Sequence, residues 1–211
     1  MTAWLRGNRW GLALVIPALL LALAANSLRL QLFWWTYKPH VATSGVQGKP
    51  VHFAEDFDDF DGHWHRALDL TVTSVTTVAA PRDPDGKPID DARTPAEAQW
   101  VKVSMHVAAS PTAVLFGCRL SLLDASGRET EYTDGNLVDS DYLPISPCIP
   151  DAHQGPVSGG PKAQGDAVEA GPRPAAYDVD AYVLTARGFR PTAVRLQWTP
   201  PRYVQIALPT T

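Results

Sequence analysis

The sequence predicts an all-β protein, an antiparallel β-sandwich preceded by one N-terminal transmembrane helix. Several stretches alternate apolar and polar residues with a period of two, which is typical of strands that bury one face. Turns rich in Gly and Pro separate these stretches. Outside one uncharged N-terminal run, no stretch has the 3.6-residue period of an amphipathic helix. A barrel with the same number of strands is the open alternative.

The transmembrane helix is expected over residues 10–29. No charged residue occurs from 10 to 28, and a helix at about 1.5 Å per residue would just cross a hydrocarbon core of about 30 Å. Arg6 and Arg9 precede this run, so the positive-inside rule predicts that residues 1–9 are cytoplasmic. The alternative is a signal peptide that is cleaved near Ala22-Leu23-Ala24.

Aromatic and basic residues flank the uncharged run, as is typical of residues at a membrane–water interface. These residues are Trp4, Arg6, Arg9, Trp10, Arg29, Trp34, Trp35 and Tyr37. They predict that the lipid bilayer is one partner of this chain.

The charge of the chain is unevenly distributed. The net charge is −4, but the first 38 residues hold four basic and no acidic residues, so the remainder holds 14 basic against 22 acidic residues, a net of −8. A body this acidic excludes a nucleic-acid-binding module that works by neutralising phosphates.

Residues 30–66 are expected to form a juxtamembrane connector, and residues 67–211 an extracytoplasmic β-sandwich. The alternation predicts strands over 68–78, 100–108, 114–123, 128–132, 177–184, 192–198 and 202–208. Asp124 to Gly127 have the composition of a hairpin turn. Residues 150–176 contain ten Gly or Pro in 27 positions, which predicts a mobile loop.

The two cysteines, Cys118 and Cys148, are expected to form a disulfide. They are an even number, lie far apart in the sequence and have no Cys-x-x-Cys spacing. Such a pair forms in an oxidising compartment, which agrees with export of the body. Two unpaired, buried thiols are the alternative.

Two stretches resemble a known family. QWVKVSMHVAASP (99–111) and LSLLDASGRETEY (120–132) are similar to the core of bacterial membrane-anchored, extracytoplasmic immunoglobulin-like domains of the telokin-like group, with Asp124, Gly127 and Tyr132 matching in type. The chain departs from the pattern at Ala109-Ser110, where Asn is often seen, in the Gly/Pro-rich loop and in the cysteine pair. The resemblance implies an immunoglobulin-like fold outside the cytoplasm and brings no catalytic residues.

The strongest candidate for site chemistry is the acidic and histidine-containing segment 55–65. His63 and His65 at i and i+2 would share one face of an extended segment and, with Asp61, could bind a transition metal. The spacing fails the calcium-loop template, because positions one and twelve would be Phe57 and Leu68. A solvated connector is the favoured interpretation, so neither a metal nor a cofactor is expected.

For the other candidate site residues, a structural role is favoured over a functional one. His106 could act as a base, Asp139 and Asp141 as an acid/base pair, and Trp100, Trp198 and Tyr203 as a carbohydrate or peptide platform. Exposed strand positions, a solvated turn and ordinary packing are the favoured interpretations. The nucleophile-elbow, zinc-protease, phosphate-loop and dinucleotide motifs are all absent from the sequence, so no catalytic residue and no enzymatic activity are expected.

The sequence therefore predicts a single-pass, membrane-anchored, extracytoplasmic binding or interaction module of a bacterial cell envelope. Its expected partner is an unidentified membrane or envelope protein, for instance within an envelope or transport assembly. A metal-binding or metal-sensing ectodomain that uses segment 55–65 is the alternative, and an envelope hydrolase is a weaker one.

Overall fold

A computed structural model of the chain describes residues 8–59, 62–83, 86–89, 94–132, 146–150, 153–157 and 172–209. The chain divides into two compact units, Met1–Pro39 and His40–Thr211. Five of the candidate residues lie outside the described part of the chain: Trp4, Arg6, Asp61, Asp139 and Asp141. Most of the loop expected over 150–176 lies outside it as well.

The N-terminal unit contains the helix α2 (Arg9–Arg29) and one π-helical segment (Leu30–Trp35). Among the residues that the structure describes, no helix is identified as sufficiently long and apolar to cross a membrane. The transmembrane helix expected over 10–29 is therefore not confirmed. The large apolar side chains that are exposed along this unit include Trp10, Leu14, Ile16, Leu21, Leu23, Trp34, Trp35 and Tyr37.

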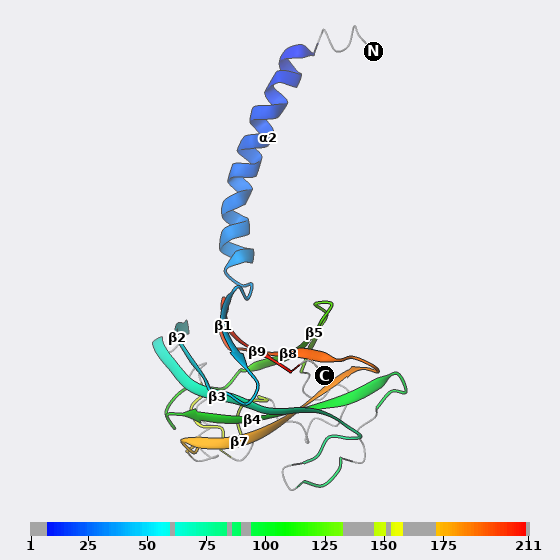
Figure 1. Cartoon of the computed structure of the whole chain (residues 1–211). Coiled ribbons are helices and arrows are strands. Elements are labelled where there is room, and N and C mark those ends of the chain that lie inside the picture. Colours follow the sequence, from blue (N-terminus) through cyan, green and yellow to red (C-terminus); the bar gives the residue numbers. More distant parts are fainter. Residues whose placement is uncertain are drawn as a thin grey trace. The chain divides into compact units, whose positions relative to one another are not determined.

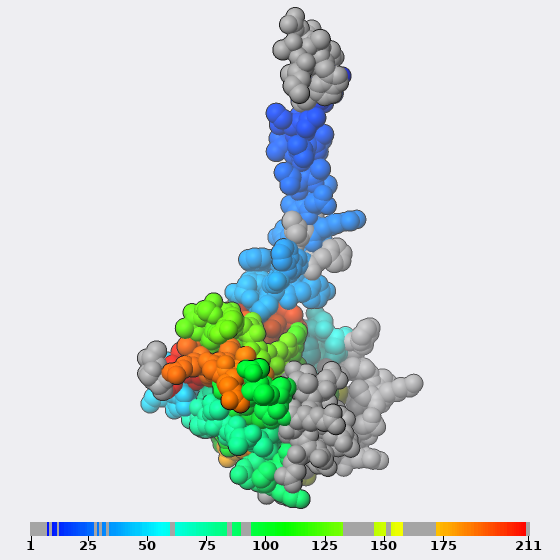
Figure 2. Space-filling model, turned by 90° about the vertical axis from the view of Figure 1, so that its right-hand side faces the viewer, coloured from blue at the N-terminus to red at the C-terminus, as the bar shows by residue number. Residues whose placement is uncertain are grey.

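The second unit is a β-sandwich, as predicted, and its two sheets form two layers (Figure 1). One sheet has the order β1 (Val41–Val46), β9 (Arg202–Ala207), β8 (Pro191–Gln197), β5 (Arg119–Asp124) and β6 (Glu129–Glu131). The other has the order β2 (Val51–Asp59), β3 (Gly62–Val78), β4 (Ala98–Ala109) and β7 (Ala176–Ala186). In the space-filling view, the orange residues of β8 lie beside the yellow-green residues of β5, as the strand order requires (Figure 2).

The core lies between the two sheets and follows the predicted alternation. In β4, Val101, Val103, Met105 and Val107 are buried, while the residues between them point to the outer face. Leu120 and Leu122 of β5 and Val194 and Leu196 of β8 face them from the other sheet. Burial of one face per strand is what the period of two provides, and it supplies the main driving force for folding.

The expectation of a connector over 30–66 is wrong for residues 41–66. This part of the chain forms β1, β2 and the first residues of β3, so the domain begins near His40 and not at residue 67. Inward positions of β2 and β3 include Glu55 and Arg66, which are both buried. Because buried positions of a strand rarely carry charge, these two residues hid the alternation.

Two further details differ from the expected antiparallel arrangement. β1 pairs with β9 in parallel, from Val41 opposite Arg202 to Val46 opposite Ala207, while the other strand pairs are antiparallel within the described part. The strand expected from residue 114 begins only at Arg119. Val114 and Leu115 are buried in an irregular segment before it. Their apolar side chains resemble the pattern of a strand in the sequence because they are buried, although the backbone there is not extended in a sheet.

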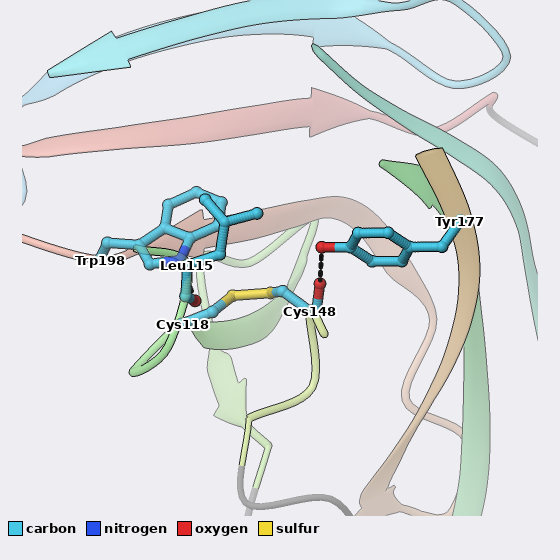
Figure 3. Close-up of a disulfide and its surroundings, with 5 residues drawn as sticks. All are labelled: Leu115, Cys118, Cys148, Tyr177 and Trp198. Carbon is cyan, nitrogen blue, oxygen red and sulfur yellow. Dashed lines mark hydrogen bonds between the residues drawn. A yellow bond between two sulfur atoms is a disulfide. The ribbon is translucent and has the colours of Figure 1, made fainter. Parts of the chain in front are cut away.

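The cysteine pair is confirmed as a disulfide between Cys118 and Cys148, with 6.0 Å between the Cα atoms (Figure 3). Both residues are buried among core side chains. The Tyr177 hydroxyl donates a hydrogen bond to the Cys148 carbonyl at 3.0 Å, and Trp198 Nε1 donates to the Leu115 carbonyl at 2.8 Å. Burial raises the pKa of Tyr177 to about 12, so this hydroxyl remains a donor at physiological pH.

The hairpin turn predicted at Asp124 to Gly127 is confirmed, and the Asp124 carboxylate organises it. Oδ1 accepts hydrogen bonds from the Ser126 hydroxyl (2.7 Å), the Ser126 amide (2.9 Å) and the Arg128 amide (3.0 Å), and Oδ2 accepts one from Arg128 Nε (2.7 Å). Gly127 has a φ of +81°, in the left-handed region that favours glycine. These bonds, with that from the Ser126 hydroxyl the largest contribution, lower the pKa of Asp124 to about 2.

We therefore expect Asp124→Asn to destabilise the domain at neutral pH but not at the acidic limit. A carboxylate with a lowered pKa stabilises the fold above its unfolded pKa near 4, and this contribution is lost as the pH falls toward 2. Urea unfolding of both proteins between pH 2 and 7 measures the difference, and NMR titration of the Asp124 carboxyl gives the pKa directly. An Asp124 pKa near 4 would contradict the assignment.

Candidate functional site

A groove of about 500 Å³ opens at the end of the sandwich where β3 ends and β8 begins. Its walls come from the end of β3 (Val75 to Thr77), the start of β4, the turn before β8 with Phe189 and Arg190, the turn after β1, and the segment after β9. Because both sheets contribute, the groove lies across the open edge between them. Its volume falls in the range of about 300–1,000 Å³ that is typical of ligand sites.

One wall of the groove is an unpaired strand edge. β2 pairs with β3 only as far as Val51 opposite Leu70, whereas β4 pairs with β3 as far as Val78. Among the described strands, none pairs with the other edge of β3 beyond Leu70. The turn after β1 covers the first part of this edge, because Gly48 N donates to the Val72 carbonyl at 2.9 Å and Gln47 Nε2 donates to the Thr73 carbonyl at 3.1 Å.

The remaining part of the edge, Val75 to Thr77, lines the groove. A strand edge carries backbone donors and acceptors that can pair with an extended segment of another chain. Thr76 and Thr77 are exposed, and Val75 packs against the core. The arrangement can therefore accept an extended peptide through backbone hydrogen bonds, with Thr77, which lies opposite Val101, and apolar walls beside it.

The lining of the groove differs in charge from the rest of the domain. Among the described residues that line it there is one cation, Arg190, and no acidic residue, although residues 39–211 together carry a net charge of −8. The two glutamines of the lining are engaged within the domain: Gln47 as given above, and Gln99 through bonds to the Phe189 carbonyl (2.9 Å) and the Gly188 amide (3.2 Å). The charge of the groove thus favours a segment that carries a carboxylate.

The outer face of the β2–β3–β4–β7 sheet carries a second polar feature, a series of cross-strand pairs between histidine and aspartate. The Nδ1–Oδ1 distances are 2.9 Å for His52–Asp69, 2.7 Å for His65–Asp56, 2.8 Å for His63–Asp58 and 2.8 Å for His106–Asp178. All four pairs are largely exposed, with histidine side chains 46–68% accessible.

The pairs on the β2–β3 hairpin alter the protonation of their members. The hydrogen bond that His63 donates to Asp58, with the negative charge of that residue, raises the pKa of His63. The hydrogen bond that Asp56 accepts from His65 lowers the pKa of Asp56, and the charges of His65 and His63 act in the same direction. In both cases the partner stabilises the charged form of the group.

The metal candidates from the sequence are only partly brought together. His63 and His65 lie side by side on one face of β3, but Asp61 is outside the described residues. Among the described residues, no group of three or more His, Cys, Asp or Glu side chains is arranged to hold a metal ion.

The other candidate residues predicted from the sequence are engaged in packing or in hydrogen bonds within the domain. Trp198 is buried and stacks on Phe53 with 5.5 Å between ring centroids, and Trp100 is buried and donates from Nε1 to the Thr94 hydroxyl at 2.7 Å. Neither indole is presented as an open binding platform. His106 lies on the outer face of β4, beside Asp178 of the neighbouring β7, which agrees with an exposed strand histidine.

The groove cannot be recognised from the sequence. Val75 to Thr77 belong to a predicted strand, and Arg190 lies between two predicted strands without a motif. The one available signal was the excess of polar residues at the end of this strand, from Thr73 to Thr77, which marks a part of the strand without a buried neighbour on both faces.

Comparison with known proteins gives two distant structural neighbours. No family model matches the chain, and no curated protein matches it either. A secreted protein from Mycobacterium tuberculosis, MPT63, is 12% identical with a TM-score of 0.41, over 79% of this chain and 97% of its own. A candidate lipoprotein from Staphylococcus aureus is 9% identical with a TM-score of 0.26, over 75% of this chain and 100% of its own.

Proposed function

We propose that this protein is an extracytoplasmic binding module that captures an extended, acidic segment of a membrane or envelope protein in the groove beside β3. The observation that carries the proposal is the unpaired edge of β3 at Val75 to Thr77, which lies in a groove whose lining has one cation and no anion. A partner strand would add to this edge, and a carboxylate of the partner would face Arg190. The activity proposed is binding and not catalysis.

Backbone pairing and charge have different roles in this mode of binding. Hydrogen bonds along the β3 edge provide affinity for any extended segment, whereas the side chains around the groove select the sequence. Val101 and Phe189 supply apolar contacts, and Arg190 penalises segments that place a cation opposite it. Because the domain is acidic overall, an acidic partner would be guided to this cationic groove and not to the general surface.

The proposed location is the outer side of the cytoplasmic membrane, with the N-terminal segment as the tether. The Cys118–Cys148 disulfide supports an oxidising compartment. The uncharged run from 10 to 28 and the exposed apolar side chains of α2 support attachment to lipid. The telokin-like, immunoglobulin-like family is proposed here on the resemblance of residues 99–132 alone.

Site-specific photo-crosslinking of the full chain in intact cells tests the proposal. A photoreactive residue at Thr77, which lies opposite the groove residue Val101, is expected to give an adduct whose crosslinked peptide, identified by mass spectrometry, contains Asp or Glu. The same residue at Thr71, which lies opposite His106 on the outer face of β3 and does not line the groove, is the matched control. The adduct is expected in the membrane pellet after an alkaline wash, since the proposed tether remains in the lipid.

Two charge reversals separate recognition by the groove from general attraction. Arg190→Glu is expected to reduce the Thr77 adduct at least tenfold, because a like charge then faces the carboxylate of the partner. Arg187→Glu, in the same turn but outside the groove lining, should leave it within twofold. Equal adducts at Thr71 and Thr77, equal effects of the two reversals, or crosslinked peptides without acidic residues would each overturn the proposal.

A further inference from the structure

The β2–β3 hairpin differs from the rest of the His–Asp face because two of its pairs are adjacent. His63 and His65 are two residues apart on one strand, so their side chains leave the same face with Cα atoms about 6.6 Å apart. Their partners, Asp58 and Asp56, occupy the directly opposite positions of β2. The two imidazoles therefore stand side by side, each with its own carboxylate.

The carboxylates determine which nitrogen of each ring remains available. Asp58 contacts Nδ1 of His63 at 2.8 Å, and Asp56 contacts Nδ1 of His65 at 2.7 Å. A neutral imidazole that donates its Nδ1 hydrogen to a carboxylate has its lone pair on Nε2. This carboxylate–histidine arrangement is the one that proteins use to orient histidine ligands and to increase their basicity toward a metal.

We propose that His63 and His65 bind one divalent transition-metal ion through their Nε2 atoms, with Asp58 and Asp56 as positioning residues and water in the remaining coordination positions. Imidazole nitrogen is a preferred ligand for copper(II) and zinc, and of the divalent first-row metals copper(II) binds such sites most tightly. Calcium and magnesium, which prefer oxygen ligands, are excluded from this pair of nitrogens. The site is independent of the groove, since none of its four residues lines it.

The same sheet offers internal controls. His52–Asp69 and His106–Asp178 have the same pairing through Nδ1, at 2.9 Å and 2.8 Å. Positions 50 and 54 beside His52, and positions 104 and 108 beside His106, are not histidine. Each of these pairs can therefore provide one imidazole nitrogen, whereas the hairpin provides two. Comparing them distinguishes a site with two histidine ligands from ordinary metal binding to single surface histidines.

The test is titration of the purified full chain, carried on a tag without histidine, with copper(II) and zinc by calorimetry. His63→Gln and His65→Gln are each expected to weaken binding at least tenfold, while His106→Gln leaves the affinity within twofold. Electron paramagnetic resonance of the copper complex is expected to show two nitrogen ligands in the wild type and one in either hairpin variant. Asp58→Ala and Asp56→Ala should weaken binding about 10–100-fold while the number of nitrogen ligands stays at two.

Three results would overturn the inference. The first is an affinity that does not change in His63→Gln and His65→Gln. The second is an equal loss in His106→Gln, which would show nonspecific binding to surface imidazoles. The third is calcium binding at the hairpin with the same affinity as copper. Circular dichroism of each variant verifies that the fold is intact, because the four side chains are exposed and their replacement leaves the core untouched.

Discussion

Replacing Arg66 alone with methionine is expected to lower the free energy of unfolding by about 3–5 kcal/mol. The guanidinium is buried, forms an ion pair with Glu55, donates from Nε to the Val114 carbonyl at 2.6 Å and lies 4.2 Å from the centroid of the Phe57 ring. Its removal leaves the buried Glu55 carboxylate without its counter-ion, and among the described residues only the backbone hydrogen bond from Thr199 remains. Urea unfolding of the purified full chain measures the loss.

The pKa shifts of Glu55 and Arg66 explain why removing one partner lowers the free energy of unfolding by more than the intact ion pair contributes to it. Burial raises the pKa of Glu55 and lowers that of Arg66, because desolvation penalises each charged form by more than their mutual attraction returns. A double variant, Glu55→Leu with Arg66→Met, replaces both charges with apolar groups and should therefore recover most of the loss. If the double variant lost as much stability as Glu55→Leu and Arg66→Met lose together as single variants, this account would be contradicted.

A solvent-exposed ion pair provides the control that tests whether burial causes the large effect at Arg66. Arg119 and Glu131 form an ion pair with an Nε–Oε1 distance of 2.6 Å, but their side chains are 65% and 47% accessible. Arg119→Met is expected to cost at most about 1 kcal/mol, since solvent screens the pair and already hydrates both charges. Equal losses in Arg66→Met and Arg119→Met would show that burial is not the cause.

Loss of the disulfide is the second change with a large expected effect. Cys118 and Cys148 are 30 positions apart, and opening the loop between them returns conformational freedom to the unfolded chain, which is expected to lower the free energy of unfolding by about 3–4 kcal/mol. The Cys118→Ala/Cys148→Ala double variant and the wild type in reductant should both show this loss in urea unfolding.

Reductant distinguishes the covalent link from the packing around it. It should destabilise the wild type and have no effect on the double variant, which lacks the bond. Tyr177→Phe removes only the hydrogen bond to the Cys148 carbonyl and is expected to cost about 1 kcal/mol with the disulfide intact. A double variant as stable as the oxidised wild type would contradict a stabilising role of the link.

Much of the sandwich could be predicted from local pattern. The predicted bounds of β4, β7, β8 and β9 lie within two residues of the observed ones, and β3 is predicted from Leu68 onward, because each alternates apolar and polar side chains over one buried face. The turn at Asp124 and the pairing of the cysteines were likewise readable, the first from turn chemistry and the second from their number and spacing. These features depend on residues close in sequence or on composition.

β1 and β2 could not be recognised in the same way. β1 is short and mostly exposed, and it exists because β9, more than 150 residues later, offers it a parallel edge. β2 places Glu55 among its inward residues, and a charge is acceptable there only because Arg66 lies opposite it on β3. Both strands depend on pairing partners that local periodicity does not reveal.

The class of fold, the disulfide and the acidic character of the body can be predicted from the chain alone, because periodicity, cysteine number and charge are properties of the sequence. The positions of the groove and of the histidine pair depend on how the strands are arranged in space. The groove requires β3 to continue beyond β2 and meet the turn before β8, and the histidine pair requires Asp56 and Asp58 opposite His65 and His63. Strand register sets both arrangements, and register is fixed by the packing of the two sheets against each other.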